Sequence, residues 1–394
     1  MENIRASGSD PLAQPVTSAI ESILAEVEVA KLKSQVSTLK KQYRSAINAL
    51  ADERESRLRF VELSNIQASP PPKRPKKKRS PDSATAVVLL SDWHVEELVP
   101  PESVMGRNHY TLSIADRRLS ELSDRMENLI RHERHLAKID RIVIAALGDF
   151  ISNSIHEDQA ELAQLQPMPA VRWAGERLRG IIDRASDLAD EVIVATAVGN
   201  HGRATHKIRL GATEQDTSYE QNLYEMMAAY EPRDNVHWQI GRGYLNVVDL
   251  DGFKVAFHHG HAIKGNIHVG ATRAIAQWQR SCPVDFHCFG HHHQFSYCRG
   301  KYLSNGSVVG YNAYALRCRL EFEPPCQSLA VIDHHRREVT RAIPIFCDRD
   351  LQETQECQLQ TSTSRTPRSG PQSNREPKVR TRRPSTSRTR QPAR

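Results

Sequence analysis

Five short motifs carry carboxylate, amide and imidazole side chains, the groups that bind divalent metals in proteins. In chain order the motifs are SDWH (91–94), LGD (147–149), VGNH (198–201), FHHGH (257–261) and GHHH (290–293). A single Asp or His after a strand is more often a cap or a turn residue than a functional group. Five such motifs in one chain instead predict that these groups meet in one site.

The order of these motifs, D-x-H, G-D, G-N-H, H-G-H and G-H-x-H, resembles the calcineurin-like metallophosphoesterase superfamily over about residues 86–335. The resemblance implies a four-layered α/β/β/α sandwich that holds two metal ions. The implied ligands of the first metal are Asp92, His94, Asp149 and His293. The implied ligands of the second metal are Asp149, which would bridge the two ions, Asn200, His259 and His291. His201 would lie beside the metals and stabilise or protonate the leaving oxygen.

These residue types suit two-metal hydrolysis. Two divalent ions about 3.5–4 Å apart can clamp a phosphoryl group and lower the pKa of a water between them. A carboxylate such as Asp149 can bridge both ions, and Asn200 adds an oxygen ligand without adding negative charge. Imidazole combined with carboxylate suits Mn, Fe, Zn or Ni better than Mg, which prefers oxygen ligands and retained water. We expect manganese, with the other four metals as alternatives.

One motif departs from the family pattern. The family often has an acidic residue directly after G-N-H, where this chain has Gly202 and then Arg203. A carboxylate there would orient His201 and raise its basicity, so the departure leaves open how His201 is held. Arg203 offers a forked donor to a phosphate oxygen, but it could equally be solvated or paired with an Asp.

Further candidates for substrate contact lie near the motifs. Lys264 follows the H-G-H motif and, together with Arg273, could form a track for a phosphate backbone. His156 lies a few residues after the GD motif, where a substrate contact and plain solvation are both open. His261 either orients a metal ligand or faces the substrate.

The histidine triplet divides by strand geometry. Side chains alternate along an extended segment, so His291 and His293 should face the same side and reach one metal each. By the same rule His292 should point away from the site, and His258 should point away from His259.

Three apolar runs rich in β-branched residues must position these groups: 86–92, 141–149 and 191–200. Continuous apolar runs are typical of strands buried on both faces. Helical spacing at 113–137, with Ser113 as a possible N-cap, and at 170–189 places helices between them. Strand and helix alternation predicts βαβ units with functional residues at the carboxyl ends of the strands. A D-G turn in 244–260 and short apolar runs at 284–289, 301–308 and 328–333 predict a second, mixed sheet in one domain over 85–347.

The N-terminal segment 17–63 is predicted to be a long helix. Its apolar residues recur in steps of three and four, as in a coiled coil, at Val29, Leu32, Val36, Leu39 and Tyr43. Val at the early a positions of the heptad and Leu at the d positions favour a two-stranded coiled coil. Glu28 and Lys33 have the spacing of an ion pair between the two helices. We therefore expect a homodimer; a single helix packed on the body, or a solvated helix, are the alternatives.

Two basic segments flank an acidic body. The total charge is +7, of which residues 73–79 contribute +6 and residues 361–394 contribute +9, which leaves −8 for the rest. The Pro- and Lys-rich linker (64–84) and the Ser-, Thr-, Pro- and Arg-rich tail (355–394) are predicted to be extended and disordered. Both suit sequence-independent binding of nucleic acid phosphates, although a solvated spacer is an equal reading of the linker.

Composition limits where the protein works. The seven cysteines form no CxxC pair, which favours reduced thiols over a disulfide framework. The sequence shows no signal pattern and no apolar run of the ~20 residues needed to span a bilayer. We expect a soluble cytoplasmic protein with no membrane partner, nuclear if its source is eukaryotic. GNHGR (199–203) and NGSVVGYNAYA (305–315) also look like phosphoesterases of phages and mobile elements, so a bacterial or phage-infected cell fits.

Three functions are compatible with these features. The leading expectation is a metal-dependent phosphodiesterase that cuts DNA or RNA as a nuclease or exonuclease. The alternative is a phosphomonoesterase for phosphoproteins or nucleotides, since the same two-metal core serves both chemistries. A nucleic-acid-binding scaffold is the third, although a scaffold has no need of seven metal ligands.

Overall fold

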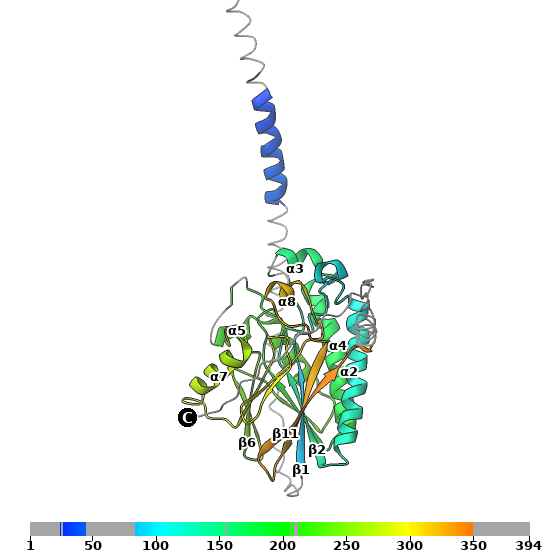
Figure 1. The fold of residues 1–394 in the computed structure, drawn as a ribbon. Coiled ribbons are helices and arrows are strands. Elements are labelled where there is room, and N and C mark those ends of the chain that lie inside the picture. Colours follow the sequence, from blue (N-terminus) through cyan, green and yellow to red (C-terminus); the bar gives the residue numbers. More distant parts are fainter. Residues whose placement is uncertain are drawn as a thin grey trace, which may run out of the picture. The chain divides into compact units, whose positions relative to one another are not determined.

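Strands and helices alternate through most of the chain from residue 83 onward (Figure 1). The computed structural model describes residues 24, 27–44 and 83–349, apart from residues 154, 156, 206 and 209–211. In chain order the elements are β1 (Ser83–Leu90), η1 (Pro101–Val104), α2 (Leu112–Glu133), β2 (Lys138–Ala146), α3 (Glu157–Leu162), α4 (Pro167–Leu188), β3 (Glu191–Thr196), α5 (Ala212–Asp216), α6 (Tyr219–Ala229), β4 (Val236–Gln239), β5 (Asn246–Leu250), β6 (Phe253–His258), α7 (Ile267–Trp278), β7 (Phe286–Phe289), β8 (Ser296–Cys298), β9 (Tyr302–Ser304), α8 (Ala313–Arg317), β10 (Cys326–Asp333) and β11 (Glu338–Phe346).

The larger sheet has the strand order β11-β10-β1-β2-β3-β4. Strands β1 to β4 run parallel, while β10 pairs antiparallel with both β1 and β11. Along β1, Val88 and Leu90 belong to one hydrophobic cluster and Val87 and Leu89 to another. Burial on both faces explains why these strands are continuous apolar runs in the sequence. The parallel order brings the carboxyl ends of β1, β2 and β3 to one edge of the sheet.

The smaller sheet has the order β5-β6-β7-β9-β8. The predicted D-G turn joins β5 to β6, with φ of 57° at Asp251 and 93° at Gly252. Two left-handed residues in succession are typical of the short hairpin loop whose twist matches the flanking strands. Phe257 and Phe286 of this sheet share a hydrophobic cluster with Val87 of the larger sheet, so the two sheets bury a common core.

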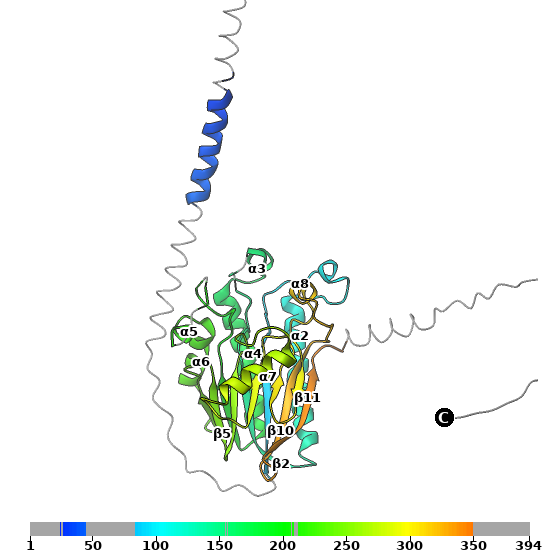
Figure 2. The same cartoon turned by 60° about the vertical axis from the view of Figure 1, so that its left-hand side comes forward.

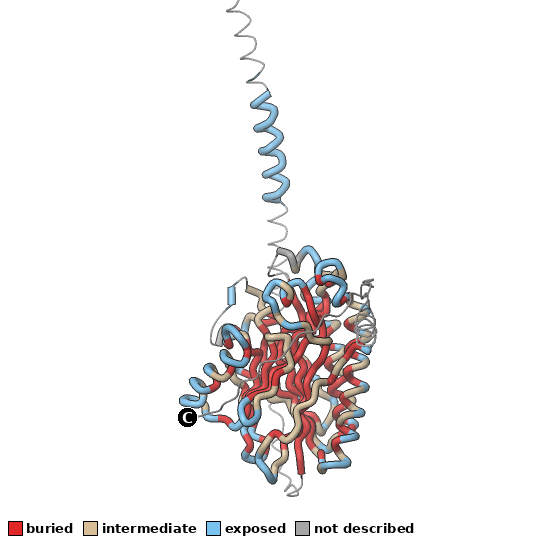
Figure 3. The backbone as a smooth tube through the Cα atoms, in the orientation of Figure 1, coloured by how far each residue is buried: buried red, intermediate tan, exposed pale blue. Residues whose placement is uncertain are grey.

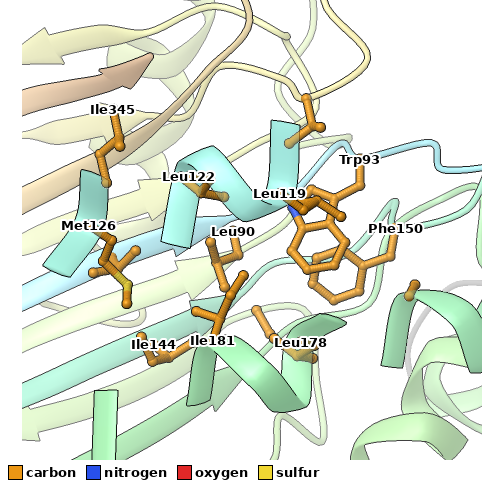
Figure 4. Packing of buried hydrophobic residues seen from close by; sticks show 14 of the residues in the cluster. Leu90, Trp93, Leu119, Leu122, Met126, Ile144, Phe150, Leu178, Ile181 and Ile345 are labelled. Atoms are coloured by element: carbon orange, nitrogen blue, oxygen red, sulfur yellow. The ribbon is translucent and has the colours of Figure 1, made fainter. Parts of the chain in front are cut away.

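Helices cover the faces of the sheets that do not meet each other (Figures 1 and 2). Leu122 of α2 and Ile181 of α4 pack with Ile144 of the larger sheet (Figure 4). Ile275 of α7 belongs to a separate cluster with Phe289 of the smaller sheet. The strands are largely buried and the outward sides of the helices are exposed (Figure 3). The body is therefore a mixed α/β fold with two sheets flanked by helices, as predicted.

The starts of α2 and β1 differ from the prediction. The N-cap of α2 is Thr111 rather than Ser113, because Thr111 Oγ1 lies 3.4 Å from the amide of Ile114, three residues further on. Strand β1 begins at Ser83, inside the predicted linker (64–84) and two residues before the predicted domain start, because Ser83 pairs with Lys138 and residue 84 pairs with both neighbouring strands.

The N-terminal segment is described only in part. Residue 24 and residues 27–44 are helical, and all of them are exposed, including Leu32 at 54% and Leu39 at 62%. These residues lie within the predicted helix 17–63, the rest of which lies outside the described residues, and its pairing with a second copy stays a prediction. The predicted tail (355–394) and the linker before residue 83 lie outside the described residues. In the described part of the chain, no helix is both long and apolar enough to cross a membrane.

Candidate metal centre

Six of the seven predicted ligands gather in two groups. One group is Asp92, His94 and His293, and the other is Asp149, His259 and His291. Within each group the possible ligand atoms all lie within 4.8 Å of one another. The seventh residue, Asn200, places its Oδ1 3.1 Å from Nε2 of His259. The structure thus brings all seven together, with His291 and His293 in different groups.

Left-handed backbone carries five of the six Asp and His side chains. The φ angles are 55° at Asp92, 48° at His94, 53° at Asp149, 70° at His291 and 53° at His293. Each residue closely follows a strand, where the chain must turn, and Asp and His tolerate this conformation better than most residues. Outliers of this kind cluster at functional sites.

The histidine triplet is not the extended segment that the alternation argument assumed. Residues 291 and 292 form a bend, and the left-handed backbone at His291 and His293 directs their side chains to the two groups. His292 lies outside both groups, with its ring 6.0 Å from that of Phe289. His258 stacks on the same Phe289 at 5.2 Å. His291 and His293 lie in different groups because of this bend, and not because of the pleat of a strand.

Both carboxylates of the site are held in their ionised form. Asp92 Oδ2 accepts from Ser91 Oγ at 2.5 Å and from the amide of His291 at 2.9 Å. Burial alone would raise the pKa of Asp92, but the hydrogen bond and charge of His293 lower it to about 2. Burial opposes ionisation of Asp149 as well, yet the charges of His259 and His201 hold its pKa well below the usual value. Both groups therefore offer anionic oxygen to a cation.

The imidazoles present nitrogens that suit a metal. Burial, followed by the charges of His201 and His293, lowers the pKa of His94 to about 3, so His94 is neutral. Its Nε2 is buried and has no hydrogen-bond partner among the described residues. His259 Nδ1 lies 2.8 Å from the Leu147 carbonyl, which only accepts, so Nδ1 carries hydrogen and Nε2 faces the site. These are the donors and charges that a divalent ion requires.

His259 shows that this point of the site stabilises positive charge. Its Nε2 lies 2.9 Å from Asp149 Oδ2. Burial would lower the pKa of His259, but the charge of Asp149 and their hydrogen bond raise it to about 10. A proton on His259 and a divalent metal would satisfy the same carboxylate, so metal binding should release this proton.

Ser152 connects the first group to the surrounding structure, and no motif predicts it. Its Oγ donates to Glu97 Oε2 at 3.1 Å and therefore accepts from His94 Nδ1 at 2.9 Å. Asn312 Nδ2 donates to the other Glu97 oxygen at 2.8 Å. The chain of contacts from Asn312 to His94 fixes the tautomer that leaves His94 Nε2 available to a metal.

Replacing Ser152 with alanine should lower the affinity for Mn²⁺ by about 10–100-fold, the usual cost of losing a partner behind a metal ligand. Calorimetric titration of the full chain would measure this loss. Ser120→Ala, an exposed serine of α2, is the matched control and should bind Mn²⁺ as the unaltered protein does. Equal affinities for the two variants would show that Ser152 does not orient His94.

A backbone carbonyl holds His201, which resolves the question raised by Gly202. His201 Nδ1 lies 3.0 Å from the Ser152 carbonyl, and its amide donates to Asp149 Oδ1 at 2.7 Å. The carbonyl can only accept, so Nδ1 carries hydrogen and Nε2 is the nitrogen that can exchange a proton. The ring lies edge-on to that of His94, with 5.0 Å between centroids.

The structure describes two of the three predicted substrate-binding residues, Arg203 and Lys264. The Arg203 guanidinium donates to the backbone carbonyls of Asn200 and Thr205, within its own loop. Lys264 is exposed after the H-G-H motif, and His156 lies outside the described residues. His261 Nε2 lies 2.9 Å from a carboxylate oxygen of Glu214, a residue outside both ligand groups.

No family model matches the chain, and no curated protein matches it. Among solved structures, an archaeal phosphodiesterase is 14% identical with a TM-score of 0.30, over 66% of this chain and 99% of that one. A Streptococcus pneumoniae protein described as a predicted phosphoesterase is 13% identical with a TM-score of 0.27, over 66% and 98%. Vps29 from Entamoeba histolytica is 16% identical with a TM-score of 0.25, over 62% and 84%. The assignment of ligands in this chain rests on its own geometry.

Proposed function

We propose that the chain is a metal-dependent phosphoesterase that hydrolyses phosphodiester bonds, as a DNA or RNA nuclease or exonuclease. The observation that carries the proposal is the pair of Asp and His groups, each with its possible ligand atoms within 4.8 Å of one another. Two divalent metals would be held by Asp92, His94, Asp149, Asn200, His259, His291 and His293. The nitrogen and oxygen donors favour manganese, with iron, zinc, nickel or magnesium as alternatives.

The residues around the metals have distinct roles in this proposal. Two bound divalent ions would neutralise phosphate charge and lower the pKa of a water. His201 is the proton donor to the leaving oxygen, because its Nδ1 is occupied by the Ser152 carbonyl and its Nε2 is the exchanging nitrogen. Arg203, Lys264 and His156 are the proposed contacts to substrate phosphate. Arg203 would have to add to or exchange its present contacts with backbone carbonyls.

Charge supports a nucleic acid substrate. Residues 73–79 and 361–394 contribute +6 and +9 to a chain whose remainder carries −8. Basic appendages of this kind bind phosphate backbones without regard to sequence, while the metals supply positive charge at an acidic body. Pairing of two copies through the helix in 17–63 would place two active sites in one particle. A phosphomonoesterase is the second candidate, and a nucleic-acid-binding scaffold is the third.

A substrate comparison tests the proposal. With Mn²⁺ added, the full chain should hydrolyse bis-p-nitrophenyl phosphate in preference to p-nitrophenyl phosphate, and it should cut end-labelled DNA or RNA. Deleting 361–394 should weaken nucleic acid cleavage and leave hydrolysis of the small diester unchanged. Preference for the monoester with no cleavage of single- or double-stranded nucleic acid would favour the phosphatase.

A further inference from the structure

Glu220 is a buried carboxylate beside the proposed metal centre that no sequence motif indicates. It lies in the first turn of α6 and is 1% exposed. Its Oε1 accepts a hydrogen bond from the amide of Phe150 at 2.8 Å, and its Oε2 accepts from the amide of Gly199 at 2.8 Å. Both oxygens are therefore used by backbone donors.

The two donors belong to two different ligand-bearing loops. Phe150 directly follows Asp149 in the loop after β2, and Gly199 directly precedes Asn200 in the loop after β3. One side chain from α6 thus spans the two loops that carry the proposed ligands Asp149 and Asn200.

Two glycines allow these loops to approach each other closely. A Cβ on Gly148 would lie 2.0 Å from the amide nitrogen of Gly199, and a Cβ on Gly199 would lie 2.0 Å from Asp149 Oδ1. No side chain could stand at either position without moving the loops apart. Contact at Gly148 and Gly199 therefore limits how closely the loops after β2 and β3 can approach. The hydrogen bonds to the Glu220 carboxylate hold the two loops at that distance.

Gly202 leaves room for the same carboxylate. A Cβ on Gly202 would lie 2.7 Å from Cδ of Glu220. The amide of Tyr219 also donates to the Gly202 carbonyl at 2.8 Å, which joins the loop of His201 to the start of α6. The space beside Gly202 is therefore filled by a carboxylate from α6 rather than by one from residue 202.

We propose that Glu220 is a positioning residue of the metal centre, which fixes the spacing between Asp149 and Asn200 by binding the backbone next to each. The proposal rests on the proposed function, because it gives these two residues the role of metal ligands. It also explains why the G-N-H motif is followed by glycine in this chain.

The two hydrogen bonds that Glu220 accepts from Phe150 and Gly199 require two accepting oxygens and do not require a proton on the carboxyl group. Burial and the negative charge of Asp149 raise the pKa of Glu220 to about 8, and the two amide donors oppose that rise. Both oxygens of a carboxyl group can accept a hydrogen bond in either protonation state. A glutamine has one accepting oxygen, so its NH₂ group would face one of the two backbone donors.

Glu220→Gln tests this role with a side chain of nearly the same shape. It should lower the affinity for at least one of two Mn²⁺ ions by about 10–100-fold in calorimetric titration of the full chain. It should also lower kcat more than it changes KM. Glu225→Gln, on the same helix and bonded to Gln221, is the matched control and should bind Mn²⁺ with unaltered affinity. If Glu220→Gln does not fold, as judged by circular dichroism, Glu220→Asp takes its place.

A double-mutant cycle with Gly202 adds a readout that general destabilisation would not produce. Gly202→Ala should displace the carboxylate and weaken Mn²⁺ binding, but it should have little further effect in a Glu220→Ala background, where the space is empty. Additive effects, or a Glu220→Gln variant that binds two Mn²⁺ ions normally, would overturn the proposal alone. An unaltered protein that binds none of manganese, iron, zinc, nickel and magnesium would instead overturn the proposed function, and this proposal with it.

Discussion

Asp149→Asn should abolish Mn²⁺-dependent phosphoester hydrolysis, with a loss in kcat of at least about 10³-fold, because metal-assisted hydrolysis depends on the metal for its nucleophile. Asparagine keeps the size of the side chain but removes the only carboxylate in its group, whose Oδ2 lies 2.9 Å from His259 Nε2. It also removes the charge that holds His259 protonated. Elemental analysis after dialysis should therefore show fewer metal ions per chain as well as lost activity.

Asp116→Asn is the matched control for this variant. Asp116 is exposed on α2 and pairs with Arg177, and an exposed ion pair contributes at most about 1 kcal/mol to stability. Its metal content and activity should equal those of the unaltered chain. Full activity of Asp149→Asn would rule out the proposed centre, whereas unfolding of Asp149→Asn by circular dichroism would transfer the test to His291→Asn, a half-buried residue of the same group.

His201→Asn should lower kcat in a way that depends on the leaving group. For a dinucleotide, whose alkoxide needs a proton, we expect a loss of about 10²–10⁴-fold, the range for a general acid. For bis-p-nitrophenyl phosphate we expect less than about tenfold, because nitrophenolate leaves without protonation. Steady-state rates on the two substrates measure the difference. Asparagine retains a nitrogen donor for the Ser152 carbonyl, so the loop should keep its conformation.

The control for His201 is His135→Asn, an exposed residue after α2 whose ring lies 6.4 Å from that of His132. Both rates should be unaffected. Equal losses on the two substrates in His201→Asn would remove the proton-donor role and favour a role in binding or metal positioning, and unchanged Mn²⁺ affinity would then exclude the latter.

Apolar runs predicted the positions of β1, β2 and β3, whereas β4, β8 and β11 were not predicted. The run around Val87 and Val88 is apolar throughout because alternate residues enter two different clusters. The D-G turn was equally predictable, since few residue pairs accept two left-handed conformations in succession. The N-cap was predicted wrongly because Thr111 and Ser113 are both good caps, and only the geometry of the first turn selects between them.

The ligands could be predicted from the sequence, but the residues that hold them could not. Each ligand lies within a short motif, whereas Ser152 acts on His94 and Glu220 acts on Phe150 across 58 and 70 residues. Serine and glutamate are common, and nothing in their neighbourhood marks these two. Gly202 was the one visible signal, because a missing side chain can mean that another side chain occupies its space.

Left-handed backbone at five site residues limits how the protein can evolve. These residues are Asp92, His94, Asp149, His291 and His293. An L-residue in this conformation costs roughly 1 kcal/mol or more, and a native domain is stable by only about 5–15 kcal/mol. Replacing any of these residues with glycine would remove the backbone strain and also remove a metal ligand. Mutations that stabilise the fold at these positions would therefore weaken metal binding. A descendant that keeps the fold without the chemistry should therefore carry glycine or asparagine where this chain has histidine.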